Sequence, residues 1–161
     1  MFHNTIKAFF TIGLLVNATG RLMAQQQVQP VSYTIEAPET VEAGAVFTVS
    51  AVFDIQPNWY VYAPIPMNAA QGKIPTRISF VPHKRLRFLG DLELPDESKG
   101  YDRYSGKDVR MSQRFQVPKD MALGEQAIRA TVTYQTCSNN ICYPPVEEEI
   151  TIEITVEQPN K

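Results

Sequence analysis

The chain has 161 residues, 43% of them hydrophobic and 20% charged, which fits one ordinary globular domain and excludes two full-sized ones. Its formal net charge of −2 at pH 7 lacks the basic excess that phosphate binding requires, so we expect no nucleic-acid partner. Twelve prolines, eight glycines, eight Phe, seven Tyr and one Trp favour many short strands and turns over long helices.

The first 24 residues are predicted to be a signal peptide that is cleaved on export. Lys7 lies in a short positive leader, and an almost wholly apolar run over 8–16 follows it. That run is less than half of the roughly twenty residues that cross a bilayer, so we expect no stable membrane span after cleavage. Both Gly20 and Ala24 fit the small residue before a cut. We place the boundary after Ala24, which leaves an exported domain over 25–161.

After this leader the chain breaks into short segments of alternating hydrophobicity, each bounded by turn residues. In the clearest one, 45–53, alternate residues from Phe47 to Phe53 are apolar, while Thr48 and Ser50 fall on the other face. Six similar runs are predicted to be strands: 59–63, 77–81, 86–89, 109–117, 127–134 and 150–156. Seven or eight strands are enough for an immunoglobulin-like sandwich, so the predicted fold class is an all-β, immunoglobulin-like β-sandwich.

Two stretches, 67–75 and 95–107, are predicted to be long irregular loops. The second is crowded with acidic and basic residues. Long loops on a rigid sandwich often carry function, although a solvated loop with no task is an equally good interpretation of the sequence alone.

Both cysteines of the chain lie in one segment near its end. The even-numbered apolar residues from Ile128 to Tyr134 should face the core, so Cys137 continues the outward set and its sulfur is predicted to be reachable. The pair Asn139–Asn140 suits a hairpin tip, because asparagine tolerates the left-handed conformation of such turns. This hairpin would bring Cys137 opposite Cys142, within the roughly 7 Å between α-carbons that a disulfide needs.

A disulfide at this position has two interpretations. It could be a structural bridge in an exported domain that serves only as a binding or assembly module. However, a bridge that closes six residues removes only about 2 kcal/mol of unfolded-chain entropy, and it would lie at a hairpin tip, outside the core. That position favours thiol–disulfide exchange. Two cysteines with no histidine beside them cannot complete a zinc site, so we expect no metal. No cofactor motif is visible, and we expect no cofactor.

Three motifs resemble a known family. The run from Tyr134 to Cys137, followed by Cys142-Tyr143-Pro144-Pro145, is similar to the N-terminal periplasmic domain of the disulfide reductase DsbD. The aromatic run 58–62 resembles that family's aromatic strand, and 102–107 resembles the loop that caps its cysteines. The resemblance spans roughly 31–156, which is the whole predicted mature domain.

The resemblance implies an immunoglobulin-like fold in the periplasm whose cysteines relay electrons. The donor would be a thioredoxin-like domain or a membrane electron conduit on a separate chain, and the acceptors would be oxidised periplasmic thioredoxin-fold proteins. Cys142 would attack and form the mixed disulfide, and Cys137 would resolve it. Tyr104 would take the place of the capping aromatic, and Asp102 that of an acid near the cysteines. The cap and pocket are thus expected to contain Asp102, Tyr104, Tyr60, Tyr62 and Tyr143.

Two departures from the family pattern concern this site. Four residues separate the cysteines here, one fewer than in the best-known members, and Arg103 stands where a second acid is usual. Neither a helix N-terminus nor a nearby lysine or histidine in the sequence lowers the pKa of Cys142, so we expect the isolated domain to react slowly with small molecules.

Overall fold

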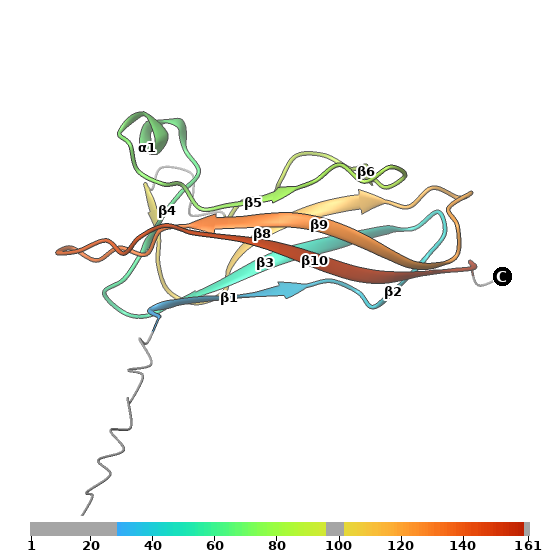
Figure 1. Ribbon diagram of the computed structural model, residues 1–161, viewed down its shortest axis with the longest axis horizontal. Helices are drawn as coiled ribbons and strands as arrows, with labels where there is room; N and C mark the ends of the chain where they lie inside the picture. The colour runs from blue at the N-terminus through green and yellow to red at the C-terminus, as the bar shows by residue number, and fades with distance from the viewer. Residues whose placement is uncertain (1–28, 96–101, 160–161) are drawn as a thin grey trace, which may run out of the picture.

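The computed structural model describes residues 29–95 and 102–159, so the predicted signal peptide lies outside the described residues. Two four-stranded sheets face each other and form a β-sandwich (Figure 1). The first sheet contains, in spatial order, β1 (Val31–Glu36), β3 (Val46–Ile55), β8 (Val109–Gln116) and β6 (Arg87–Phe88). The second contains β2 (Thr40–Glu42), β10 (Val146–Glu157), β9 (Gly124–Tyr134) and β5 (Arg77–Phe80). The predicted all-β sandwich is confirmed.

The core lies between the two sheets and follows from the alternation of side chains along the long strands. On β3, the residues from Phe47 to Phe53 that were predicted to face inward are all buried. Ser50, predicted to face outward, is also buried, and its hydroxyl forms a hydrogen bond of 2.8 Å with that of Ser112 on β8. The pairing of two hydroxyls satisfies both groups and makes their burial tolerable.

All seven predicted strand runs contain a strand, but their lengths differ from the prediction. The run 59–63 narrows to β4 (Val61–Tyr62), and the run 150–156 widens to β10. Four elements were not predicted: β1, β2, β7 (Arg103–Tyr104) and the short helix α1 (Pro66–Ala70). Of the two predicted loops, 67–75 contains most of α1, and 95–107 contains β7. Among the described residues, no helix is long and apolar enough to cross a membrane.

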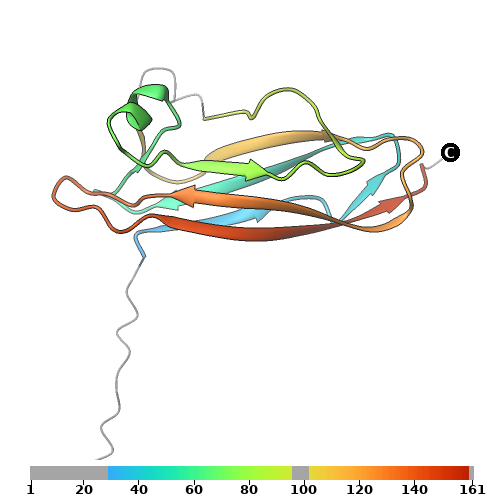
Figure 2. The ribbon, with the colours of Figure 1, turned by 45° about the horizontal axis from the view of Figure 1, so that its top comes forward.

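One end of the sandwich is extended by β4 and β7, which pair with each other. Beyond the end of β9, the chain forms a hairpin over 135–145, and Tyr60 pairs with Cys137 of this hairpin. Tyr62 pairs with Pro75, just before β5. Within the sheet β9 is paired with β5, and beyond the end of β9 the hairpin is paired with the segment that leads into β4. Figures 1 and 2 both show the hairpin projecting past the sheets at the same end of the molecule as α1.

Candidate functional site: the disulfide hairpin

A disulfide joins Cys137 and Cys142 across the hairpin. The two residues are directly opposite, and the backbone hydrogen bonds lie on either side of them: Ser138 donates to the Ile141 carbonyl and Tyr143 to the Thr136 carbonyl, each at 2.8 Å. The cysteines therefore form a non-hydrogen-bonded pair, the position where opposing α-carbons come closest, here 4.0 Å. The predicted hairpin and its cysteine pairing are confirmed.

The two cysteines differ in exposure. Cys142 lies on the outer strand of the hairpin and is exposed, whereas Cys137 is completely buried. The prediction of a reachable Cys137 sulfur is therefore wrong. Its side chain does point away from the core as predicted, because Cys137 is paired with Tyr60, whose neighbour Val61 faces the core. The side chain of Cys137 lies between those of its two cross-strand neighbours on the same face, Tyr60 and Cys142. Its backbone exchanges two hydrogen bonds of 2.9 Å with Tyr60, and Cys142 covers its other side.

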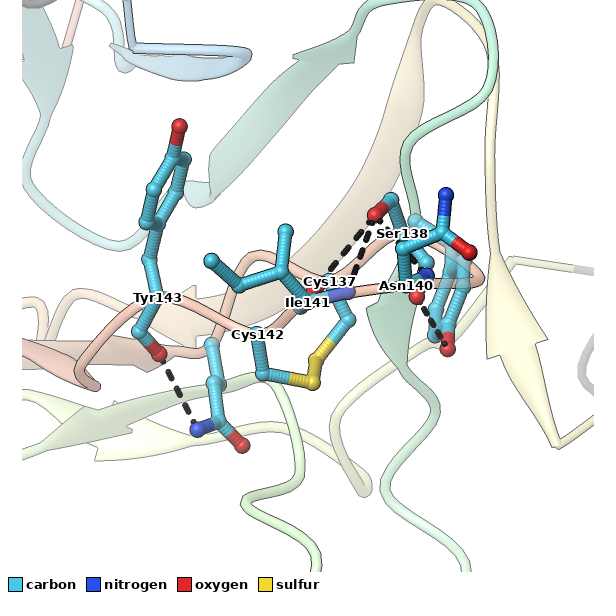
Figure 3. The surroundings of a disulfide bond; sticks show 8 residues. Cys137, Ser138, Asn140, Ile141, Cys142 and Tyr143 are labelled. Carbon is cyan, nitrogen blue, oxygen red and sulfur yellow. Dashed lines mark hydrogen bonds between the residues drawn. A yellow bond between two sulfur atoms is a disulfide. The ribbon is translucent and has the colours of Figure 1, made fainter.

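Side-chain alternation divides this end of the molecule into two faces. Tyr60 lies opposite Cys137, and Tyr62, two residues along the same strand, lies opposite Arg103. Their side chains therefore share one face with the disulfide. We call this the disulfide face: Cys137, Cys142, Tyr60, Tyr62 and Arg103. Figure 3 shows the disulfide pointing to one side of the hairpin, while Ile141 and Tyr143 point to the other.

The two tyrosines of the disulfide face contact each other, and one of them also contacts the cysteine hairpin. The rings of Tyr60 and Tyr62 meet edge to face, with centroids 5.5 Å apart, and the Tyr60 hydroxyl donates to the Ser138 carbonyl at 3.2 Å. The neighbouring Tyr62 hydroxyl and burial raise the pKa of Tyr60 further above neutral pH, so its phenol keeps the proton that it donates to Ser138. Tyr60 thus ties the cysteine hairpin to β4.

Asp102 lies beside this face as an ionised carboxylate. One oxygen accepts a hydrogen bond from Arg103 Nε at 3.1 Å, and the other lies 3.5 Å from Lys73 Nζ. The hydrogen bond from Arg103 is the main cause that lowers the pKa of Asp102. The structure thus brings three of the predicted site residues, Asp102, Tyr60 and Tyr62, to the side of the molecule where the disulfide lies.

Two other predicted site residues lie on the opposite face. Tyr143 stacks on Trp59, with ring centroids 5.2 Å apart. Tyr104 lies opposite Val61 and is fully buried with it in the core between the sheets. Because the ring of Tyr104 packs on the core face in this arrangement, its shielding of the sulfurs stays a prediction. On this side Trp59 and the turn 105–107 also line a hollow of about 480 Å³, which lies apart from the sulfurs.

Two residues of this region were missed by the sequence analysis. Asn68 on α1 is completely buried, and its amide donates to the carbonyls of Ala63 at 2.9 Å and Asp102 at 2.6 Å. Lys73 reaches the Asn68 amide oxygen at 3.3 Å and places its ammonium 4.8 Å from the centre of the Tyr62 ring. Both come from a stretch predicted to be a loop, where no periodic pattern indicated that side chains turn inward.

Comparison with known proteins identifies the family. No curated protein sequence matches the chain. Among solved structures, a cohesin module from a Clostridium perfringens family 33 glycoside hydrolase is similar, with 9% identity, a TM-score of 0.43, and coverage of 80% of this chain and 98% of that module. The family model described as "Thiol:disulfide interchange protein DsbD, N-terminal" matches residues 22–154, which include the disulfide hairpin and both sheets except the last three residues of β10. The chain belongs to the family of the N-terminal domain of the thiol:disulfide interchange protein DsbD.

Proposed function

We propose that this chain is a periplasmic relay domain that passes reducing equivalents to oxidised exported proteins through its Cys137–Cys142 dithiol. Family membership implies thiol–disulfide exchange. The observation that carries the relay is the unequal exposure of the cysteines: a partner can reach Cys142, while Cys137 lies buried directly behind it. The proposal includes export, with removal of residues 1–24.

The exposed cysteine performs the intermolecular step. In the reduced domain, the Cys142 thiolate attacks one sulfur of the acceptor's disulfide. That disulfide breaks, a mixed disulfide forms, and the second acceptor sulfur leaves as a thiolate that takes up a proton. Access to the sulfur decides which cysteine can do this, and only Cys142 is exposed.

The buried cysteine performs the intramolecular step. Cys137 loses its proton and attacks the Cys142 sulfur, which breaks the mixed disulfide and forms the Cys137–Cys142 bond. The acceptor has then received two electrons and two protons. The α-carbons of the pair lie 4.0 Å apart on hydrogen-bonded strands, so the resolving sulfur is already held close to the sulfur that it attacks. A donor dithiol regenerates the reduced domain by the same steps in reverse.

The partners in this proposal are thioredoxin-like on both sides of the relay. The donor would be a thioredoxin-like domain or a membrane electron conduit on a separate chain, and the acceptors would be oxidised periplasmic thioredoxin-fold proteins. Such partners supply their own low-pKa cysteine, which compensates for the absence of an activating group next to Cys142 in the sequence. Fast exchange would then depend on docking rather than on the intrinsic reactivity of this domain.

The reduction potential of the Cys137–Cys142 couple tests the proposal. The mature domain is equilibrated in glutathione buffers, and its free thiols are quantified. We expect a value of about −230 to −180 mV, the range of exchange proteins, and we expect Cys137→Ser to accumulate mixed disulfides that Cys142→Ser does not form. A potential below about −300 mV would indicate a structural bridge and would support the non-catalytic binding module instead.

A further inference from the structure

The disulfide face holds two cations over two tyrosine rings. The guanidinium carbon of Arg103 lies 4.4 Å from the centre of the Tyr60 ring, and Lys73 Nζ lies 4.8 Å from that of Tyr62. Both distances are within the roughly 6 Å over which a cation is attracted to an aromatic face. The tyrosine rings therefore hold positive charge beside the cysteine pair.

Asp102 neutralises only part of this charge. Its two oxygens are shared between Arg103 and Lys73, and the bond from Arg103 keeps its pKa low, so it counts as one negative charge at neutral pH. Two cations and one carboxylate leave this cluster with a net charge of +1. The chain as a whole carries −2. Among the described residues, the charge of this cluster is thus opposite in sign to that of the whole chain.

Arg103 is the more accessible of the two cations. Its side chain is 45% exposed, against 26% for Lys73, whose ammonium also reaches the Asn68 amide oxygen. Asp102 accepts from the Nε of Arg103, and a guanidinium carries four further N–H donors in a fixed plane. Held between Asp102 and the Tyr60 ring, this plane is ordered before a partner arrives, which suits recognition of a carboxylate.

We propose that the disulfide face selects exchange partners whose surface beside the reactive cysteine carries carboxylates, and that Arg103 is the residue that determines this specificity. The inference rests on the proposed exchange function, and it concerns which partners are favoured. Opposite charges on two docking surfaces raise the association rate and disfavour partners of the same sign. A negatively charged protein with this positive cluster on its disulfide face would orient such a partner toward Cys142.

The test compares two small disulfides that differ in charge. In a Cys137→Ser background, the single remaining thiol of Cys142 is mixed with 5,5′-dithiobis(2-nitrobenzoate), which is anionic, or with 4,4′-dithiodipyridine, which is neutral. The ratio of the two rate constants reports the local potential, because a change in thiolate fraction affects both reagents alike. Arg103→Gln removes the charge and keeps a side chain of similar length.

We expect Arg103→Gln to lower the ratio of anionic to neutral rate by about two- to five-fold at low ionic strength, the size of one unit charge acting across partly solvated space. The difference should shrink at high salt, and Arg103→Lys should restore most of the ratio. The matched control is Arg110→Gln on β8. Arg110 is 40% exposed and pairs with Glu36 and Asp108, and its removal should leave the ratio unchanged.

An unchanged ratio in Arg103→Gln would overturn the inference. If neither rate constant changes, the Arg103 charge does not act at the cysteine, and if both fall by the same factor, Arg103 acts on thiol ionisation and not on the approaching disulfide. Neither result bears on the relay itself, which is decided by the reduction potential. Conversely, a reduction potential below about −300 mV would overturn the relay, but it would not change the measured ratio of the two rate constants.

Discussion

Cys137 and Cys142 differ in exposure because of their positions in one small sheet. Cys137 has a strand on each side, with Tyr60 on one and Cys142 on the other, whereas Cys142 is at the edge of the hairpin. Paired residues carry their side chains on the same face, so Cys137 has a side-chain neighbour on each side and Cys142 has one on one side only. The order of attack in the proposed relay thus follows from the pairing of Tyr60, the residue before β4, with the hairpin.

This difference in exposure predicts different alkylation rates for the two variants that each keep one of the cysteines. In Cys137→Ser the remaining thiol is exposed, and in Cys142→Ser it is buried. We expect iodoacetamide to modify the first at least about tenfold faster under native conditions, because a buried thiol reacts only when the structure opens locally. In denaturant the two rates should converge, which controls for intrinsic reactivity. Equal native rates would contradict the assignment of Cys142 as the attacking sulfur.

For single residues, the sequence predicts the direction of a side chain better than its burial. Alternation along 127–134 correctly indicated which side of the strand Cys137 occupies. It could not indicate that Tyr60, 77 positions earlier, pairs with Cys137 and encloses it, because that contact is set by the course of the chain rather than by local pattern. The same limit applies to Tyr104, whose place in the family motif says nothing about which face of β7 it occupies.

Among the elements, α1 and β7 hold the charged part of the site together. Asn68 of α1 donates to the carbonyl of Asp102, the residue just before β7, and Lys73 bridges from the segment after α1 to the Asp102 carboxylate. Neither element has an apolar period from which the sequence could predict it. The long strands β3, β8, β9 and β10 have one, and each of their predicted runs overlaps the observed strand.

Replacement of Asn68 by alanine is expected to destabilise the domain by about 1–3 kcal/mol. The change removes two hydrogen bonds, each worth about 0.5–1.5 kcal/mol, from the carbonyls of Ala63 and Asp102, which keep one backbone donor each. Denaturant unfolding of the oxidised protein measures the effect, and Gln71→Ala, at the exposed end of the same helix, is the matched control. A loss equal to that of the control would show that α1 does not hold Asp102.

For the whole molecule, stability resides in the two sheets and their shared core. Most of the buried apolar side chains form two clusters between the sheets, and the cysteine hairpin projects beyond both. The sequence predicts this division, since the alternating runs define the core and the cysteines fall outside them. We therefore expect this disulfide to open and close without a change in core packing, as the proposed relay requires.

Reduction of the disulfide should therefore lower the free energy of unfolding only slightly. A bridge that closes six residues contributes about 2 kcal/mol by restricting the unfolded chain, whereas truncation of a buried core residue such as Ile128→Ala costs about 2–5 kcal/mol. Denaturant unfolding of the oxidised and reduced domain measures the first value, and unfolding of oxidised Ile128→Ala measures the second. A reduced domain that is unfolded at 25 °C would make the disulfide a structural staple. A reduced domain that stays folded means that both redox states share one scaffold, so that the free energy of exchange is set at the hairpin and its partners rather than by refolding of the sandwich.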